Sequence, residues 1–363
     1  MKYIKKYKLN IIWLTLLLFF ACLFAIFKSN LSLIDFIVSN ITRPFRAFIG
    51  NITAIMPFSV AELFWAILII WIIAYLSINI VRLMKNGISA LHNIIHCVLN
   101  IVCILLTVYA GFTLLWGLDY YAISFEEKNN IKTSLISVDA LYETTAYFTR
   151  ELNAASANVP RDENMLFDGN INDIFEASAG IYDPLVIQYP CLEAREHRAK
   201  KMLLSPILSL VDFTGFYFPF TGESTINVNQ PAAFIPSTIA HELAHQRGVV
   251  QEDVCNFLAI RACELTDNKI YNYSGLLFGY IHLSNALYTA NRDKWQELSS
   301  TLTDGVKADL NENNRYWQHF KTPITTVSNA AYEGFLQGYG EKSGLASYGK
   351  VVDLLVQYYQ NEK

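Results

Sequence analysis

The amino-acid sequence predicts a mainly α-helical protein in two parts: three N-terminal transmembrane helices, followed by an α+β, predominantly helical domain with a small sheet. Three observations support this fold class. Of the 363 residues, 53% are hydrophobic and only 17% are charged, which is typical of a membrane-attached chain. Three segments in the first third are long and apolar enough to cross a bilayer. Most of the remaining sequence has helical periodicity.

The predicted spans lie at residues 9–27, 60–81 and 94–117. Each approaches or exceeds the length of about 20 apolar residues that a bilayer requires. A cleaved signal peptide is the alternative for the first span. Its apolar run is longer than a usual signal core and no small-residue cleavage site follows it, so the sequence favours a membrane anchor.

The charge of the chain divides at the end of the third span. Residues 1–118 hold nine Lys and Arg against two acids, a net of +7, whereas residues 119–363 hold nineteen against thirty, a net of −11. We therefore expect a membrane domain at 1–118 and a second domain at 119–363. The acidic second domain makes a nucleic-acid partner unexpected and should disfavour strongly acidic substrates.

Basic residues predict how the spans are oriented. Four lysines precede the first span, and Arg82 and Lys85 lie in the short turn between the second and third spans. Because Lys and Arg accumulate in cytoplasmic segments, we expect the N-terminus and this turn to be cytoplasmic. The domain at 119–363 then lies outside the cytoplasm.

The six cysteines do not predict a disulfide framework. Three fall within the spans, and Cys255 and Cys263 are eight residues apart in one predicted helix, too distant to be bridged. The chain has no Cys-x-x-Cys pair, so a metal site built from thiolates is not expected. We interpret the cysteines as small buried side chains.

Secondary structure in the second domain is predicted from periodicity and turn residues. A helix is expected over 126–158, turns and loops over 159–192, and a helix over 192–211 that stops or kinks at Pro206. Residues 215–236 are the best strand candidate. The chain beyond the next helix is expected to be helical to Lys363, with breaks at Pro323 and at 340–344.

The stretch IAHELAHQ, residues 239–246, carries the chemistry. Residues four apart point the same way on a helix, so His241 and His245 present both imidazoles to one point. Two imidazoles suit zinc, which then needs a third protein ligand and a water. Glu242 would project beside that water and accept its proton during attack on a carbonyl. Ser237 or Thr238 is expected to cap this helix.

A third ligand is expected from the next helix. Gly248 can end the first helix and a second starts near Gln251, so a tight turn can fold Glu252 back towards the histidines. Asn256 lies one turn further and could accept the free N–H of a zinc-bound imidazole. The alternatives are a solvated first-turn acid for Glu252 and a polar surface residue for Asn256. A structural zinc is a further alternative, although three ligands beside a free carboxylate suit a catalytic site better.

A second class of zinc peptidase is excluded by two differences. In the metzincin pattern a third His would fall at Gln251, and an amide is a weak zinc ligand. That class also requires a methionine turn downstream, and this chain has no methionine after Met202.

Residues 205–263, from SPILSL through HELAH to NFLAIRAC, resemble the core of a bacterial membrane family labelled domain of unknown function 3810. The three spans and the later stretches at 304–320 and 343–359 resemble the same family. Those proteins are similar to gluzincin zinc metallopeptidases, in which the helix after HExxH brings a third Glu ligand. That pattern maps onto Glu252, Cys255 and Asn256. The resemblance implies a zincin-like domain at the cytoplasmic (inner) membrane of a bacterium.

The resemblance also implies how substrate binds. The strand STINVN, residues 224–229, would line the cleft and pair with extended substrate backbone. Glu223, Asn227 and Tyr280 are candidates to line that cleft. An oxyanion donor is also expected in a peptidase, and the sequence leaves its choice open among Tyr273, Tyr280, His282, Tyr316 and His319.

Together these observations predict a membrane-anchored, Zn²⁺-dependent hydrolase that acts on peptide or protein substrates. Zinc-activated water would attack, and Glu242 would be the general base. The alternative is a zinc-binding envelope sensor or scaffold without turnover. A sensor usually needs a sizeable cytoplasmic output, and the predicted cytoplasmic pieces are only about ten residues each by the assigned spans. The sequence therefore favours the enzyme.

Overall fold

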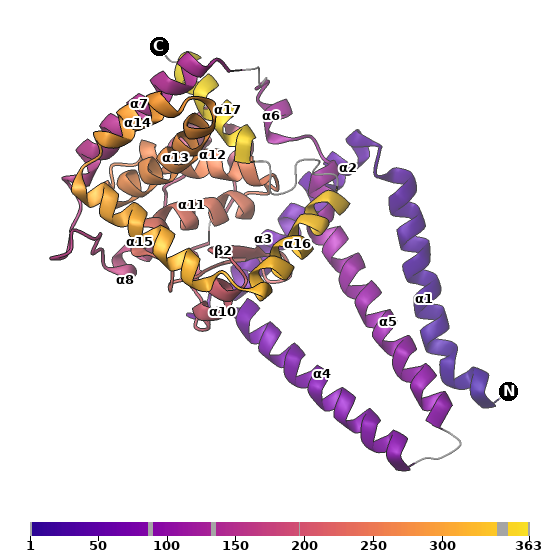
Figure 1. Ribbon diagram of the computed structural model, residues 1–363. Coiled ribbons are helices and arrows are strands. Elements are labelled where there is room, and N and C mark those ends of the chain that lie inside the picture. Colours follow the sequence, from indigo (N-terminus) through magenta and orange to yellow (C-terminus); the bar gives the residue numbers. More distant parts are fainter. Residues whose placement is uncertain (1, 86–89, 132–135, 196, 340–347, 362–363) are drawn as a thin grey trace. The chain divides into compact units, whose positions relative to one another are not determined.

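Figure 1 shows the computed structural model of the chain, which describes residues 2–85, 90–131, 136–195, 197–339 and 348–361. The protein is mainly helical and has a small three-stranded sheet, as the sequence predicts. Its contacts form two units. The first unit consists of residues 1–49, 60–123 and 219–221, and the second unit consists of residues 50–59, 124–218 and 222–363.

Three long helices dominate the first unit: α1 (Lys2–Phe27), α4 (Val60–Lys85) and α5 (Ala90–Leu115). Each contains an apolar stretch of 21 to 24 residues that is long enough to cross a membrane, which confirms the three predicted apolar helices. Polar side chains join α1 to α5. Asn10 Nδ2 donates to Asn100 Oδ1 at 2.6 Å, and Trp13 Nε1 donates to Thr107 Oγ1 at 2.7 Å. Such bonds are a common link between apolar helices.

Short helices accompany the long ones. Between α1 and α4 lie α2 (Leu31–Ile37), the π-helix η1 (Val38–Thr42) and α3 (Arg43–Thr53), and the 3-10 helix η3 (Gly117–Tyr121) follows α5. Arg46 and Asp119 join α3 to η3 within the first unit. Both are buried, and the guanidinium makes two bonds to the carboxylate, at 2.7 and 3.0 Å. A buried charge needs such a partner because it has lost its water.

The second unit contains the remaining helices: α6 (Phe125–Lys128), α7 (Val138–Ser156), α8 (Ile171–Glu176), α9 (Asp183–Gln188), η4 (Pro190–Leu192), α10 (Ser205–Leu210), η5 (Ala232–Phe234), α11 (Ile235–Gln246), α12 (Glu252–Leu265), α13 (Lys269–Ala290), α14 (Arg292–Ser300), α15 (Asp304–Phe320), α16 (Pro323–Gly338) and α17 (Tyr348–Asn361).

Two predicted helices differ from the structure. The helix expected over 126–158 is two helices, α6 and α7. The prediction of a single helix over 192–211 is wrong, because η4, a strand and α10 occupy that range. Pro206 lies in the first turn of α10 and starts it, since proline fits there without losing a helical hydrogen bond. Pro323 likewise starts α16. The break expected at 340–344 lies outside the described residues.

The core of the second unit is built on α7, α11, α12, α13 and α17. All residues of α12 from Asp253 to Cys263 are buried. Glycines allow α13 to approach its neighbours: a Cβ on Gly279 would lie 2.4 Å from the Phe148 ring on α7, and one on Gly275 would lie 2.3 Å from Cys263 Cβ on α12. This packing fixes α13 closely against α7 and α12.

The sheet consists of β1 (Lys200–Lys201), β2 (Gly215–Phe218) and β3 (Glu223–Ile226), in the order β1-β3-β2. β1 is parallel to β3, whereas β2 is antiparallel to it and pairs Gly215 with Ile226. The central strand β3 thus has neighbours on both sides, and β2 is an outer strand. Ser224 Oγ donates to the backbone oxygen of Glu242 at 2.9 Å, which holds the sheet against α11.

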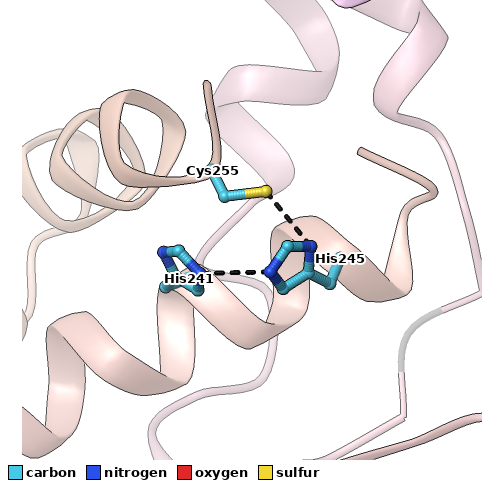
Figure 2. A group of neighbouring side chains, drawn as sticks. All are labelled: His241, His245 and Cys255. Atoms are coloured by element: carbon cyan, nitrogen blue, oxygen red, sulfur yellow. Dashed lines mark hydrogen bonds between the residues drawn. The ribbon is translucent and has the colours of Figure 1, made fainter. Parts of the chain in front are cut away.

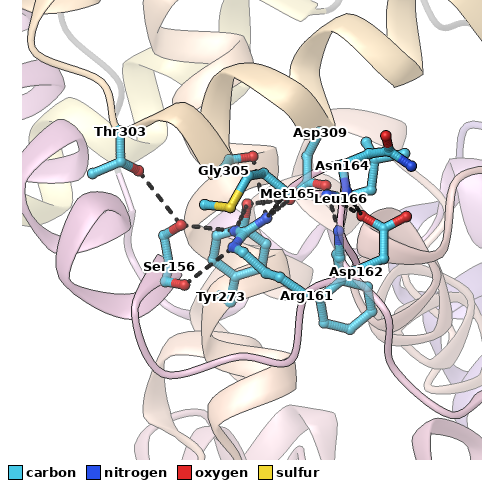
Figure 3. A network of polar contacts seen from close by, with 11 residues as sticks. Ser156, Arg161, Asp162, Asn164, Met165, Leu166, Tyr273, Thr303, Gly305 and Asp309 are labelled. Atoms are coloured by element: carbon cyan, nitrogen blue, oxygen red, sulfur yellow. Dashed lines mark hydrogen bonds and ion pairs between the residues drawn. The ribbon is translucent and has the colours of Figure 1, made fainter.

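A buried polar network holds the loop after α7 to α15 and α13 (Figure 3). Arg161 donates to Asp309 Oδ2 at 3.1 Å and to the Tyr273 hydroxyl at 3.0 Å. Tyr273 in turn donates to Asp309 Oδ2, and the backbone N–H of Phe167 donates to Asp309 Oδ1 at 2.9 Å. The charges compensate each other away from water, so the network stabilises this side of the core only as a complete set.

Candidate metal centre

The centre is built on α11, a tight turn and the start of α12. α11 begins at Ile235 rather than at a Ser237 or Thr238 cap, because Pro236 already lies in its first turn. The backbone N–H of Ser237 is instead bonded to Ser274 Oγ at 3.0 Å. α11 ends at Gln246, and Gly248 has a φ of +81°, a left-handed conformation that favours glycine. The turn returns the chain to α12, which starts at Glu252.

The two histidines of α11 face each other through their Nε2 atoms, which are 3.1 Å apart. Their outer nitrogens contact oxygen acceptors. His241 Nδ1 lies 2.8 Å from Asn256 Oδ1, and His245 Nδ1 lies 2.8 Å from the backbone oxygen of Val249. Because an oxygen acceptor requires a proton on Nδ1, the lone pair of each neutral ring is on Nε2. The two lone pairs therefore point at one place.

Glu252 completes this group from the first position of α12. Its Oε2 lies 3.2 Å from His241 Nε2 and its Oε1 lies 3.6 Å from His245 Nε2. Burial raises the pKa of the Glu252 carboxyl, but the two histidines outweigh burial and hold that pKa well below its usual range. Burial lowers the pKa of His245, but the interactions with Cys255 and Glu252 outweigh burial and raise that pKa well above its usual range.

The donor set fits a divalent cation. Two imidazole lone pairs and a carboxylate oxygen repel one another unless a proton or a metal ion lies between them. Imidazole and carboxylate are both established zinc ligands, and three protein ligands leave one tetrahedral position open. The side chain of Glu252 is 21% exposed and that of His241 is 15% exposed, so solvent reaches the group.

Cys255 offers a second donor set (Figure 2). Its Sγ lies 3.3 Å from His245 Nδ1, and His241, His245 and Cys255 form a possible metal-binding group whose ligand atoms lie within 4.8 Å of one another. The thiol, however, donates to the backbone oxygen of Val249 at 3.5 Å, on the Nδ1 side of the His245 ring. Burial raises the pKa of Cys255 to about 11, which favours the protonated thiol.

Glu242 lies beside the histidines with its carboxylate in the interior. The residue is only 3% exposed, and its Oε2 has no hydrogen-bond partner among the described residues. Burial raises the pKa of the Glu242 carboxyl above its ordinary value, and the opposing effect of His245 and His241 only reduces this rise. The first residue of β2 leaves room for this side chain, because a Cβ on Gly215 would lie 3.0 Å from Glu242 Oε1.

Tyr332 contacts Glu252, and the sequence gives no indication of this contact. It lies on α16, and its hydroxyl donates to Glu252 Oε1 at 2.5 Å. It is one of 21 tyrosines and stands 80 residues after its partner. No local pattern marks it, because the contact depends on how α16 packs.

The structure gives the cleft candidates other contacts. Glu223 is buried and ion-paired with Lys200. Asn227 is also buried, and its Nδ2 donates at 3.0 Å to both Ser209 Oγ and the Phe213 backbone oxygen. Tyr280 is 3% exposed on α13, and burial raises its pKa. Their roles in a cleft stay predictions.

The other candidates for the oxyanion donor also have different surroundings. Tyr273 belongs to the Arg161 network, and the Tyr316 hydroxyl contacts Ser209 and accepts from Asn229 Nδ2 at 2.8 Å. His319 is exposed on α15. His282 is buried on α13, where burial and then the charge of His241 lower its pKa to about 4.

The comparisons with known proteins identify a family but no activity. No curated protein and no solved structure matches the chain. A family model described as "Protein of unknown function (DUF3810)" matches residues 38–356, which include the α11–α12 turn and all of the metal-centre side chains. Because the match covers most of the sequence, the chain belongs to the DUF3810 family.

Proposed function

We propose that the chain is a membrane-anchored, zinc-dependent metallopeptidase with a zincin-like second unit. One observation carries the proposal. The Nε2 atoms of His241 and His245 and the carboxylate of Glu252 converge within 3.1 to 3.6 Å of one another. Beside them lies the buried Glu242 Oε2, which has no hydrogen-bond partner within the described parts of the chain. Convergent ligands with one free carboxylate are the composition of a hydrolytic metal site.

The ligand set proposed is His241, His245 and Glu252. Their facing atoms need no rearrangement, and both outer histidine nitrogens keep their oxygen partners. Ligation by Cys255 would require His245 to turn its Nδ1 to the metal and give up the Val249 oxygen. Asn256 holds the His241 ring in the orientation that a metal ligand needs.

Each residue of the site then has a stated task. A zinc ion held there would supply Lewis acidity and lower the pKa of a water towards neutrality. Glu242 Oε2 would take the proton from the attacking water and later deliver it to the leaving amine, which a carboxylate with a raised pKa does well. Asn256 and the Val249 oxygen would keep both imidazoles fixed.

The position of the sheet supports a peptide substrate. Gly215, at the start of the outer strand β2, lies directly against the Glu242 carboxylate. Extended peptides commonly bind beside a strand, where backbone groups supply affinity. β3 has neighbours on both sides, so β2 rather than the predicted strand at 224–229 would be the one that faces the substrate.

The location follows from the spans. The three apolar helices would hold the protein in the cytoplasmic membrane of a bacterium, and the basic residues around them would place the second unit outside the cytoplasm. Peptides and proteins of the cell envelope are then the accessible substrates.

The test uses the full chain purified in a mild detergent, with bound zinc and peptide hydrolysis both measured. Wild type should hold one zinc per chain and cleave members of a peptide library. Glu242→Gln should keep the zinc and lose turnover, whereas His245→Ala should lose both. Glu297→Gln, the same change at an exposed position of α14, is the matched control and should behave like wild type.

Two results would contradict the proposal. Equal turnover by wild type and Glu242→Gln would show that Glu242 is not the general base. Stoichiometric zinc without hydrolysis of peptides or cell-wall fragments would favour the sensor or scaffold instead.

A further inference from the structure

The two carboxylate oxygens of Glu252 have different partners. Oε2 is the nearer oxygen to the histidine pair, at 3.2 Å from His241 Nε2. Oε1 is 3.6 Å from His245 Nε2 and accepts the Tyr332 hydroxyl proton at 2.5 Å. Both oxygens therefore lie near the histidines, and Oε1 alone is also held from α16.

The Tyr332 ring is fixed by aromatic neighbours. It meets the Phe213 ring edge-on, with centroids 5.2 Å apart, and stacks on the Phe335 ring at 6.1 Å. These contacts involve only the ring, so they would survive removal of the hydroxyl. They leave the phenol little freedom to follow a carboxylate that moves.

The helix that carries Tyr332 is itself anchored to the turn before β2. Ser328 Oγ donates to the Val211 backbone oxygen at 3.0 Å, and Asn329 Nδ2 donates to Asp212 Oδ2 at 3.0 Å. Asp212 has a φ of +66°, so the turn is tight. The hydroxyl of Tyr332 is therefore held by α16 at a defined place beside Glu252.

This arrangement affects how Glu252 can bind a metal. A carboxylate binds through one oxygen or through both, and binding through both would fill the position that a zinc hydrolase keeps for water. A strong O–H···O⁻ bond on Oε1 opposes binding through that oxygen. Partners that orient a ligand are typically worth 10–100-fold in metal affinity or activity.

We propose that Tyr332 is a positioning residue that restricts Glu252 to metal binding through Oε2 alone and so reserves the remaining coordination position for the reacting water. The inference rests on the proposed function, because it assumes that Glu252 is a ligand. It adds that α16 must be in place for the site to work, because α16 carries Tyr332, 80 residues after Glu252.

The experiment replaces the native metal with cobalt(II), whose visible absorption is strong in four-coordinate sites and weak in five-coordinate ones. The full chain is stripped with a chelator and reloaded with cobalt(II) or zinc(II) in detergent. Wild type should give the four-coordinate spectrum. Tyr332→Phe should bind the metal with a weaker, five-coordinate spectrum, and its kcat with zinc should fall about 10–100-fold while KM changes little.

Tyr316→Phe is the matched control, since its hydroxyl contacts Ser209 and Asn229 rather than Glu252. It should keep the wild-type spectrum. Identical cobalt spectra for wild type and Tyr332→Phe would overturn the inference and leave the proposed function intact. A wild-type chain that takes up neither metal would overturn the proposed function itself. The spectrum needs no substrate, so the two failures are distinguishable.

Discussion

His241 Nε2 and His245 Nε2 lie 3.1 Å apart, while the opposite nitrogen of each ring contacts an oxygen. If both imidazoles were neutral, their lone pairs would point at each other, which is unfavourable unless a proton or a metal ion lies between them. Glu252 adds negative charge at the same place. The site could thus hold a metal ion, as proposed above, and the choice of its third ligand can be tested directly.

Removal of Glu252 and removal of Cys255, the two candidates for the third ligand, should have opposite effects on zinc binding. Glu252→Ala should abolish stoichiometric zinc binding, whereas Cys255→Ala should retain it, because the thiol lies on the Nδ1 side of His245. Metal analysis of the purified chains measures this, with Cys263→Ala as the control for loss of a buried thiol from α12. A thiolate-to-cobalt charge-transfer band in the cobalt-loaded protein would show instead that Cys255 is a ligand.

Gly215→Ala should impair turnover more than metal binding. The added Cβ would lie 3.0 Å from Glu242 Oε1 and 3.1 Å from the Thr225 oxygen, so the carboxylate must move. Displacement of a catalytic group by about 1 Å can cost on the order of 100-fold in rate. We expect kcat to fall by about 10–100-fold with zinc content unchanged. Gly334→Ala on α16, where an added Cβ would have no neighbour within 4 Å, should leave kcat unchanged.

Arg161→Ala should strongly destabilise the second unit. The change leaves Asp309, whose side chain is 2% exposed, without its cation. Breaking a buried pair from one side costs about 3–5 kcal/mol. The free energy of unfolding of the full chain in detergent, from urea titration, measures the loss. Arg315→Ala breaks the pair with Glu312, in which the Arg315 side chain is 77% exposed, and should cost at most about 1 kcal/mol. Equal losses would show that the Arg161 network contributes little.

His282 should make the metal-free protein less stable in mild acid. In the folded chain burial holds the pKa of His282 at about 4, against an ordinary 6.5. Below pH 6.5 the unfolded chain therefore binds a proton that the folded chain does not, and stability falls as the pH decreases from 6.5 towards 4. The loss between pH 8 and pH 5 should be about 2 kcal/mol.

Urea titrations of chelator-treated protein at the two pH values measure this dependence. His282→Gln removes the titrating group, so its stability should change less between pH 8 and pH 5 than that of wild type. His319→Gln is the control at an exposed position of α15 and should retain the wild-type dependence. A His282→Gln chain with the full dependence would assign the effect to other groups.

Labelling of introduced cysteines should reveal the orientation of the chain. Asp293→Cys, at an exposed position of α14, should react with a membrane-impermeant maleimide in intact spheroplasts. Arg82→Cys, at the end of α4, should react only after lysis. Wild type gives the background from the native cysteines. The reverse pattern would place the second unit in the cytoplasm.

Local sequence patterns were sufficient for features that depend on neighbouring residues. A run of apolar residues predicted each of the three long helices, because crossing a bilayer requires only length and hydrophobicity. The four-residue spacing of His241 and His245 predicted that their rings share one face of a helix, as they do in α11. Gly248 predicted the end of that helix, because glycine adopts a left-handed φ, here +81°, without the steric cost that a Cβ adds.

Tertiary structure decided the features that join distant segments. The sequence showed that Glu252 could fold back to the histidines, but the packing of α12 against α11 and α13 places it there. The contact of Tyr332 with Glu252 depends on α16 and has no local signal. The mistaken helix at 192–211 has the same cause, since β1 forms by pairing with β3 rather than by its own propensity. Sequence periodicity records which face of a segment is apolar, but which partner covers that face is decided by the free energy of the whole packed core.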